Sequence, residues 1–224
     1  MDKLNSDQQL AYQKLVNFIN SDSKSFLLLG SAGSGKTTVI INFFAETSLK
    51  IAFCAFTNKA TQVLRKTAKK FNIKFSVSFG TIHQILGLRP YLDEIGDLKF
   101  LYQKNYSKIK DYDIVIFDEC SCISKELLFY ITDSKPEKTK LIFLGDNWQL
   151  PPINEELSKT FHYCGSNKAI LKKIMRSTNT YMELINTNLQ EYITHFKNND
   201  LDKLQEFILN IHTVYFTKHN LQNL

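Results

Sequence analysis

Short apolar segments recur along the chain, each bounded by polar or turn-forming residues. They are shorter than ordinary helices and lack alternating polar positions, which is typical of strands buried on both faces of a parallel sheet. We expect four such strands, at residues 25–29, 51–56, 114–117 and 141–144. Apolar positions at helical spacing predict helices at residues 6–20, 38–46, 58–71 and 125–131. Ser6 and Gln9 have the spacing of a capping box at the start of the first helix. Alternating strands and helices predict an α/β fold with a central, mostly parallel sheet.

Two segments depart from this alternation. Residues 79–87 resemble a loop that enters a short helix, which Gly87 would end. The apolar signal then weakens between Arg89 and Tyr112, where Pro90 opens the segment and residues 94–97 resemble a hairpin tip. We therefore expect a small inserted hairpin at about residues 89–112.

A glycine-rich loop joins the first expected strand to the next helix. It consists of Gly30, Ser31, Ala32, Gly33, Ser34, Gly35, Lys36 and Thr37, which fit the pattern G-x-x-x-x-G-K-[ST] without a mismatch. Glycines allow backbone N–H groups to face a phosphate, and the helix that continues through Thr38 adds a partial positive charge. Lys36 would reach the β- and γ-phosphates, and Thr37 would bind Mg²⁺. The alternative is a surface turn, which the flanking strand and helix disfavour. The loop therefore predicts binding of a nucleotide together with Mg²⁺.

Two acidic residues follow the third expected strand directly. Asp118 and Glu119 would lie at the carboxyl end of a parallel strand, where open α/β sheets bind their ligands. Asp118 is a candidate for holding Mg²⁺ through water, and Glu119 is a candidate base for the attacking water. The alternative is a pair of solvated acids in a turn.

Composition excludes several classes of protein. The chain has 224 residues, of which 43% are hydrophobic, and no apolar run is long enough for a membrane span. Its N-terminus lacks the apolar core of a signal peptide, so we expect a protein of the cytoplasm, or of wherever the genome is replicated, and not a secreted one. The spacing of the four cysteines does not match a metal site, and we expect free thiols.

The distribution of charge points to a polyanionic partner. The net charge is +6, and no Asp or Glu occurs between Thr47 and Leu92. The same window contains Lys50, Lys59, Arg65, Lys66, Lys69, Lys70, Lys74 and Arg89. Such a stretch favours binding to nucleic acid, although part of it also fits an ordinary solvated helix face.

Several stretches, in the right order, resemble the superfamily 1 DNA helicases, and most closely their RecD/Dda type. Residues 4–11 are similar to the family's adenine-reading Q motif, with Gln8 as the reading residue. The phosphate loop is similar to motif I, and residues 57–60, 81–83, 118–119, 145–152 and 171–177 are similar to motifs Ia, Ib, II, III and IV. Two residues depart from the family pattern: Phe56 stands where the family often has proline, and Cys120 stands where it usually has alanine. The resemblance implies a RecA-like P-loop NTPase fold.

The resemblance also implies roles for individual residues. Lys36 and Glu119 would be catalytic, and Gln149 would contact the γ-phosphate or the attacking water. Arg176 would act as an arginine finger from a second RecA-like domain, the alternative being a surface arginine. Single-stranded DNA, with RNA as the alternative, would be contacted by Thr57, Asn58, Lys59, Thr81 and His83. For His83 a core histidine is an equal alternative. The insertion would match the strand-separating pin, with Phe100 or Tyr91 stacking on the duplex end.

The domain organisation follows from the same resemblance. Residues 1–175 would form one motor domain, and residues 176–224 the start of a second. A complete second domain needs roughly 100 residues or more, so the rest would come from further chain or another polypeptide. Residues 179–196 and 201–211 have helical patterns and residues 213–216 a strand pattern. We expect this chain alone to bind ATP, and DNA weakly, without unwinding.

Three other classes of function remain to be compared. A GTPase would need Asn-Lys-x-Asp, and the stretch from Asn58 to Thr61 lacks the aspartate. A nucleotide-dependent regulatory ATPase that does not translocate fits the phosphate loop but leaves the basic stretch unexplained. An RNA helicase of the same superfamily is a nearer alternative, because phosphate contacts carry no sugar or base information. The motifs favour a DNA helicase that moves 5′→3′, a polarity that comes from the resemblance alone.

Overall fold

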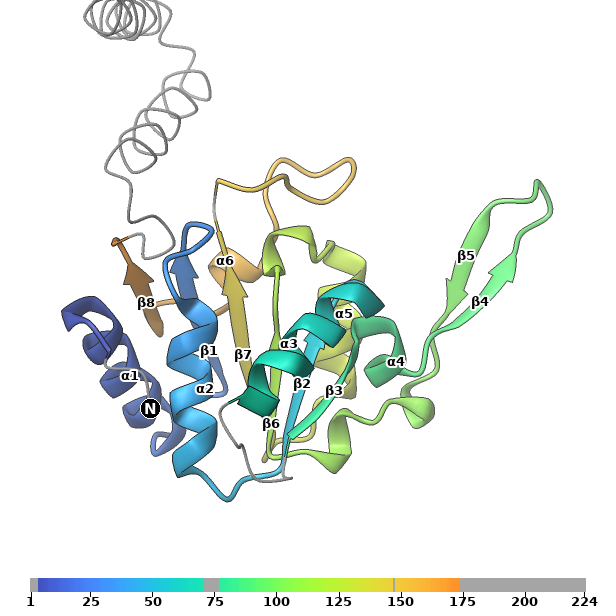
Figure 1. The fold of residues 1–224 in the computed structure, drawn as a ribbon. Helices are drawn as coiled ribbons and strands as arrows, with labels where there is room; N and C mark the ends of the chain where they lie inside the picture. Colours follow the sequence, from blue (N-terminus) through green and yellow to red (C-terminus); the bar gives the residue numbers. More distant parts are fainter. Residues whose placement is uncertain (1–3, 71–76, 147, 174–224) are drawn as a thin grey trace, which may run out of the picture. The chain divides into compact units, whose positions relative to one another are not determined.

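The computed structural model describes residues 4–70, 77–146 and 148–173. Its centre is a sheet in which every pair of neighbouring strands is parallel. The strands, in the spatial order β3-β2-β6-β7-β1-β8, are β1 (Ser25–Gly30), β2 (Ile51–Ala55), β3 (Val77–Thr81), β6 (Ile114–Phe117), β7 (Lys140–Gly145) and β8 (Lys168–Leu171). The predicted α/β fold is therefore confirmed, with all four expected strands in the sheet (Figure 1).

Helices cover both faces of the sheet. They are α1 (Ser6–Ile19), α2 (Lys36–Glu46), α3 (Asn58–Lys70), α4 (Ile82–Leu86), α5 (Lys125–Ser134) and α6 (Thr160–Tyr163), with 3-10 turns η1 (Lys104–Tyr106), η2 (Ile109–Asp111) and η3 (Cys120–Cys122). Side chains of α1, α2 and α3 pack in one buried cluster, and those of α4 and α5 pack in a second. Two covered faces explain why the central strands are continuous apolar runs in the sequence.

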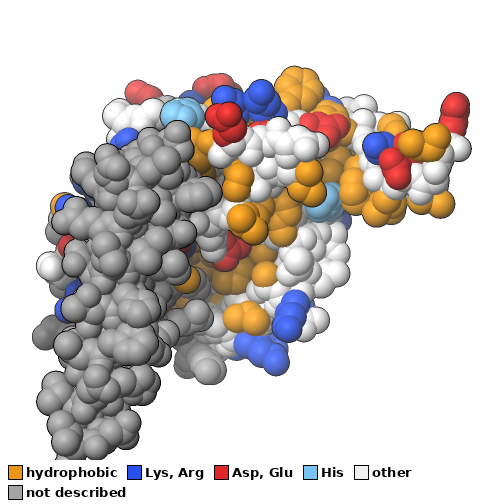
Figure 2. Space-filling model, turned by 90° about the horizontal axis from the view of Figure 1, so that it is seen from above, with side chains coloured by type: hydrophobic (Ala, Val, Ile, Leu, Met, Phe, Trp, Pro, Cys, Tyr) orange, Lys and Arg blue, Asp and Glu red, His pale blue; other side chains and the backbone are white. Residues whose placement is uncertain are grey.

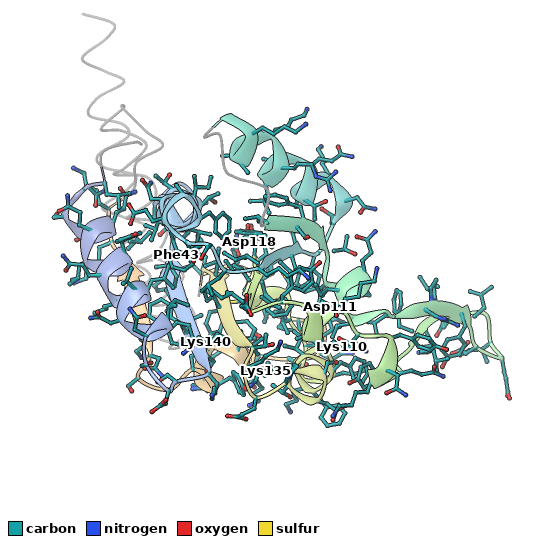
Figure 3. The ribbon with its side chains drawn as sticks, turned by 90° about the horizontal axis from the view of Figure 1, so that it is seen from below. Phe43, Lys110, Asp111, Asp118, Lys135 and Lys140 are labelled. Carbon is teal, nitrogen blue, oxygen red and sulfur yellow. The ribbon has the colours of Figure 1, made fainter. Side chains whose placement is uncertain are left out.

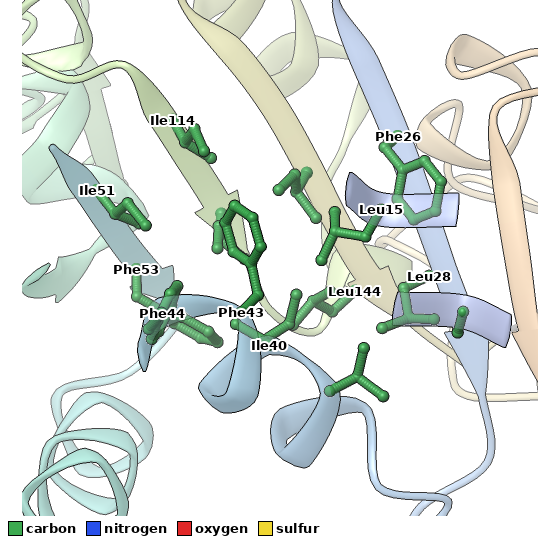
Figure 4. Packing of buried hydrophobic residues seen from close by; sticks show 14 of the residues in the cluster. Leu15, Phe26, Leu28, Ile40, Phe43, Phe44, Ile51, Phe53, Ile114 and Leu144 are labelled. Atoms are coloured by element: carbon green, nitrogen blue, oxygen red, sulfur yellow. The ribbon is translucent and has the colours of Figure 1, made fainter. Parts of the chain in front are cut away.

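Helix α2 contributes four side chains to the first of these clusters, Val39, Ile40, Phe43 and Phe44. Figure 4 shows Ile40, Phe43 and Phe44 of this helix against side chains of the central strands. Phe44 meets Phe53 of β2 edge to face, with ring centroids 5.9 Å apart. A fully buried side chain of this kind contributes about 1.5–3 kcal/mol to stability. The packing therefore fixes α2, and the loop before it, on the sheet.

Some local predictions differ from the structure. Asn5, rather than Ser6, caps α1, and its capping-box partner is Gln8 rather than Gln9. Strand β3 (Val77–Thr81) was not predicted, and its last residues lie where a loop was expected from residue 79. The short helix ending at Gly87 is present as predicted. The edge strand β8 was not predicted.

The inserted hairpin is present. It consists of β4 (Arg89–Leu92) paired antiparallel with β5 (Leu98–Leu101), and both strands are exposed along their whole length. The tip lies between them, at residues 93–97, as the sequence predicts. In Figure 1 the hairpin extends away from the sheet on the side of α4.

Two further expectations concern the chain as a whole. The four cysteines are free thiols, as predicted. Within the described residues, no helix has both the length and the hydrophobicity that crossing a membrane requires.

Candidate active site

The phosphate loop lies at the carboxyl end of β1, where Gly30 ends the strand and Lys36 begins α2. Gly33 and Gly35 have φ angles of 83° and 90°, in the left-handed region that favours glycine. Ser34 N donates to Ser31 O at 3.1 Å, which closes the turn. The loop therefore has the geometry that the sequence pattern requires.

The ammonium of Lys36 lies against this loop. It donates to the carbonyl oxygens of Gly30 and Ser31, the second at 3.3 Å. The side chain is half-buried, so the positive charge is held at the phosphate-binding turn and remains partly open to solvent. Lys36 is thus placed where a nucleotide's β- and γ-phosphates are expected.

Gln8 of α1 contacts the phosphate loop through its side chain. It is buried, its amide nitrogen donates to Ser34 O at 3.2 Å, and its amide oxygen accepts from Asn5 N at 3.0 Å. A Cβ on Gly35 would lie 2.2 Å from the Gln8 amide nitrogen, so residue 35 must be glycine for this approach as well. The role of Gln8 in reading adenine stays a prediction, and the structure adds a contact to the phosphate loop.

The strand order brings the two acidic residues to the same edge. Strand β7 pairs with β1 on one side and β6 on the other, so only one strand separates the phosphate loop from Asp118 and Glu119. The opposite, amino-terminal edge is marked in Figure 3 by Lys140, at the start of β7. Parallel strands therefore collect the loop, the two acids and the segment after Gly145 at one end of the sheet.

The carboxyl group of Asp118 has a perturbed pKa of about 6, raised first by burial and second by the charge of Glu119. The positive charge of Lys36 and a 3.0 Å hydrogen bond from Glu119 N act in the opposite direction. Asp118 is therefore close enough to Lys36 to interact electrostatically with it. A divalent cation would lower this pKa further by favouring the carboxylate.

The donor set at this edge suits Mg²⁺. Within the described residues there is no cluster of three or more His, Cys, Asp or Glu side chains that could hold a metal ion. Mg²⁺ needs no such cluster, because it is usually bound by one or two carboxylates together with substrate phosphates. Asp118 supplies a carboxylate and Thr37 a hydroxyl, both of which are oxygen ligands of the preferred kind.

Glu119 has an unusual backbone conformation. Its φ and ψ angles are 55° and 44°, the left-handed region, which a non-glycine residue adopts at a cost of roughly 1–3 kcal/mol. Such residues cluster at functional sites, where surrounding packing enforces them. Glu119 is half-buried and directly follows the Mg²⁺ candidate, which suits a base acting on water near the γ-phosphate.

Gln149 joins the acidic segment through a residue that the sequence analysis missed. Its side-chain oxygen accepts from Ser121 Oγ at 3.1 Å, two residues after Glu119. Asp146 directly follows the carboxyl end of β7, is buried and accepts a hydrogen bond from Trp148 N at 3.0 Å. The rule that identified Asp118, an acid directly after a buried strand, would also have singled out Asp146.

Cys120 explains a glycine in the neighbouring strand. A Cβ on Gly145 would lie 2.5 Å from Cys120 Sγ, so the thiol occupies the space above the end of β7. Burial raises the pKa of Cys120 to about 12, which keeps the thiol neutral. The departure from alanine at this position is therefore accommodated by packing.

The candidate nucleic-acid residues lie along neighbouring strand ends. Thr57, Asn58 and Lys59 are exposed where β2 leads into α3, and Thr81 pairs in register with Ala55 of β2. The Thr57 hydroxyl accepts from Ala60 N at 3.1 Å, and the side chain of buried Thr81 caps α4. The structure thus brings the two segments together, with both threonine hydroxyls also used as helix caps.

His83 contacts the hairpin rather than the core alone. Its ring centroid lies 4.5 Å from that of Phe100, and burial lowers its pKa, so that it is neutral at pH 7. Two residues that the resemblance assigns to the nucleic-acid path are therefore neighbours. Arg176 lies outside the described residues, as do the segments at 179–196, 201–211 and 213–216.

Four basic residues of the acid-free stretch lie on the exposed side of α3. Lys59, Arg65, Lys66 and Lys69 are all exposed. Among the described residues, the ion pairs lie elsewhere, at Lys24–Glu137, Lys99–Asp93 and Lys104–Asp133. Figure 2 views the molecule from above, towards the carboxyl ends of the strands, with the hairpin extending to the right. Positive charge on α3 is consequently not neutralised by neighbouring acids in this part of the chain.

Comparison with known families identifies the domain that carries this site. The model of a family described as AAA domain matches residues 13–155, which contain the phosphate loop, the acidic pair and Gln149. The chain belongs to this AAA domain family. Its fold and motifs are those of the RecA-like motor domain of superfamily 1 helicases, so the resemblance found in the sequence is confirmed at that level.

Individual relatives of this AAA domain extend the comparison. Protein R530 of Acanthamoeba polyphaga mimivirus, whose function is uncharacterised, is 32% identical over 98% of this chain and 48% of its own length. The RecBCD enzyme subunit RecD of Buchnera aphidicola is 31% identical over 68% of this chain and 27% of its own length. A Bacteroides Pif1 helicase, solved in complex with ADP-AlF3 and single-stranded DNA, has the same fold, with a TM-score of 0.57 and 20% identity over 85% of this chain and 47% of that one. The chain thus spans about half or less of the length of these proteins.

Proposed function

We propose that this chain is the ATP-hydrolysing motor domain of a DNA helicase or translocase, in which hydrolysis stimulated by single-stranded DNA drives movement along the strand. The observation that carries the proposal is the convergence of Lys36, Asp118, Glu119 and Gln149 at one sheet edge, beside the exposed start of α3. The Pif1 structure with a nucleotide analogue and single-stranded DNA supports it.

Each residue of the site has a distinct part in ATP hydrolysis. The backbone of the phosphate loop and Lys36 bind the β- and γ-phosphates. Thr37 and Asp118 would hold Mg²⁺, which would supply positive charge to the phosphate oxygens. Glu119 accepts a proton from the attacking water, and Gln149 orients that water or contacts the γ-phosphate. Arg176 would stabilise the transition state from a second motor domain, a contribution of about 10³–10⁵ in rate.

The nucleic-acid path runs across the ends of β2 and β3. Thr57, Asn58 and Lys59 offer hydrogen-bond donors to phosphate and sugar, and His83 with Phe100 offers ring faces for stacking. The hairpin acts as the element at which a duplex separates. Movement is 5′→3′, and it requires a complete second motor domain, from further chain or from another polypeptide, acting wherever the genome is replicated or repaired.

The experiment that tests this function is an ATPase assay with and without single-stranded DNA, single-stranded RNA and duplex DNA. It should use this chain and the same chain joined to a complete second motor domain, with Lys36→Ala as the inactive control. Stimulation of at least about ten-fold by single-stranded DNA supports the proposal. Equal or greater stimulation by RNA would favour the RNA helicase, and hydrolysis unaffected by any nucleic acid would favour a regulatory ATPase.

A further inference from the structure

The root of the hairpin is fixed to α4 on one side. The ring of Phe100 lies against His83, and the guanidinium of Arg89 lies over the ring of Tyr106, 4.2 Å from its centroid. Gly87 has a φ of 65°, and a Cβ there would lie 2.4 Å from Tyr106 O, so the chain returning from the hairpin packs directly on the end of α4.

On the other side, a compact set of contacts joins the root to α5. The ring of Tyr102, one residue after β5, stacks on Tyr130 with centroids 4.2 Å apart and an interplanar angle of 17°. Its hydroxyl donates to Asp133 Oδ2 at 2.7 Å and lies 2.9 Å from Ser134 Oγ. Lys104 adds an ion pair to Asp133 Oδ1 at 3.1 Å. Tyr102 thus contacts the last turns of α5 through both its ring and its hydroxyl.

The other end of α5 belongs to the nucleotide site. The helix begins immediately after η3, which follows Glu119, and Ser124 caps it. Lys125 N donates at 2.8 Å to Glu155, which lies in the segment that follows Gln149. Leu128 and Ile131 bury the helix in the core beneath the sheet. Helix α5, about 15 Å long, therefore connects the catalytic edge to the hairpin root.

The hairpin needs such an attachment. Two-stranded hairpins are marginally stable on their own in water. Here Pro90, Leu92, Leu98 and Phe100 occupy paired positions on the same face of the ribbon, and all four are exposed. The orientation of the hairpin therefore depends on the contacts at its root rather than on a core of its own.

We propose that Tyr102 is a positioning residue whose hydroxyl fixes the β4–β5 hairpin to α5, and so holds the hairpin at a set angle to the nucleotide site. The inference rests on the motor function proposed above. Tyr102 takes part in no chemical step. Its bonds to Asp133 and Ser134 of α5 only position the hairpin. Tyr102→Phe isolates this role, because the ring that stacks on Tyr130 is kept and only the hydroxyl is lost.

A distance measurement on this chain tests the geometry. Cys122 is the one exposed cysteine of the four and lies just before α5, and Ile95→Cys would place a second label at the hairpin tip, where the side chain is 83% exposed. Tyr130→Phe is the matched control, because it removes from the same ring pair a hydroxyl whose hydrogen bond goes to Glu126, within α5. We expect Tyr102→Phe to widen the spin-label distance distribution about two-fold and Tyr130→Phe to leave it unchanged. Equal widths in all three proteins, or equal broadening by both substitutions, would overturn the proposal.

A second readout detects the bond itself. The hydrogen bond from Tyr102 is the largest cause that lowers the pKa of Asp133, followed by the one from Lys104. Tyr102→Phe should therefore raise the pKa of Asp133 in an NMR titration, and Tyr130→Phe should not. An unchanged Asp133 titration in Tyr102→Phe would show that the hydroxyl does not hold α5, which contradicts the proposal.

Unwinding separates this proposal from the proposed function. In the protein with both motor domains, Tyr102→Phe should lower the base pairs opened per ATP by about five-fold, with DNA-stimulated ATPase within about two-fold of wild type. A variant with residues 92–98 replaced by a short turn serves as the reference for loss of the hairpin. If that variant stops unwinding while Tyr102→Phe has no effect, the positioning role fails and the motor function stands. If neither change affects unwinding, the strand-separating role of the hairpin fails.

Discussion

The nucleotide edge of the sheet and the β4–β5 hairpin are fixed in opposite ways. At the nucleotide edge, buried parallel strands hold the loop after Gly30 and the acids after Phe117, so the site is supported by the core on both faces of the sheet. The hairpin has no buried residue in either strand, and a few contacts at its root determine its direction. The chemistry is therefore placed by packing, whereas the element that would meet a duplex is placed by a small number of polar and aromatic contacts.

The largest expected effect lies at the nucleotide edge. Glu119→Gln should keep ATP binding while lowering hydrolysis about 10²–10⁴-fold, because the amide cannot accept the proton of the attacking water. The measurement pairs nucleotide binding by fluorescence with steady-state ATPase on the protein with both motor domains. Loss of binding together with hydrolysis would argue against the base role.

Substitutions in the core and in the hairpin should have very different effects on the free energy of unfolding. Phe53→Ala in β2 should lower the free energy of unfolding by about 3–5 kcal/mol, because it opens a cavity beside Phe44. Leu98→Ala in β5, where the side chain is 60% exposed, should change it by less than about 0.5 kcal/mol. Urea unfolding of the two variants checks the contrast. A large cost at Leu98 would mean that the hairpin has a packed core of its own.

The pH dependence of stability should reveal the buried carboxyl group. The pKa of Asp118 is about 6 in the fold against an ordinary 3.8, so between these pH values the native state binds more protons than the unfolded state. Stability therefore falls as pH rises from about 4 to 6, and Asp118→Asn should remove this loss. Without nucleotide or Mg²⁺, the variant should exceed wild type by about 1–3 kcal/mol at pH 7 and by little at pH 4. A difference that does not change with pH would contradict the assigned pKa.

Gln8 allows base reading to be separated from support of the loop. Gln8→Ala should weaken ATP and GTP alike by about five-fold, because the bond to Ser34 O is lost whatever the base. Any additional loss confined to ATP measures adenine reading by the same amide. Binding of both nucleotides by calorimetry gives the two contributions, and unchanged affinity for both would remove Gln8 from the site.

The smallest and most distributed effect concerns the basic stretch. Affinity for single-stranded DNA should fall with salt, with a logarithmic slope of about −0.7 for each phosphate contacted. Lys59→Ala should make that slope less steep. Lys24→Ala should not change the slope, because Lys24 lies outside the basic stretch and is paired with Glu137. A slope near zero in wild type would place the basic face of α3 outside the binding path.

The same contrast explains what the sequence could predict. The central strands were recognisable because burial on both faces makes residues 114–117 and 141–144 continuously apolar. The edge strands β3 and β8 were missed because Ser78, Gly80 and Lys168 interrupt the apolar pattern where only one neighbour strand is present. The cap of α1 was misplaced by one residue, because Asn5 and Ser6 are both good capping residues.

The candidate site divides along the same line. Lys36, Thr37, Asp118 and Glu119 could be proposed from a local pattern after a strand, because loop and strand geometry suffice to place them. The bond from Ser121 to Gln149 and the left-handed backbone at Glu119 depend on how separate segments meet, which no local pattern specifies. Tyr102 carries no motif at all, and its contacts with α5 arise only when the insertion folds back on the domain.

The open surroundings of the hairpin tip have an evolutionary consequence. Gly96 turns at a φ of 86°, and among the described residues no atom beyond its two chain neighbours lies within 4 Å of where its Cβ would be. Residues added or removed there would therefore meet no neighbour in this part of the chain. Homologous proteins could therefore differ in the length and side chains of this hairpin while keeping the same ATPase domain. Selection could thus change which nucleic-acid substrates the hairpin meets without altering the residues that hydrolyse ATP.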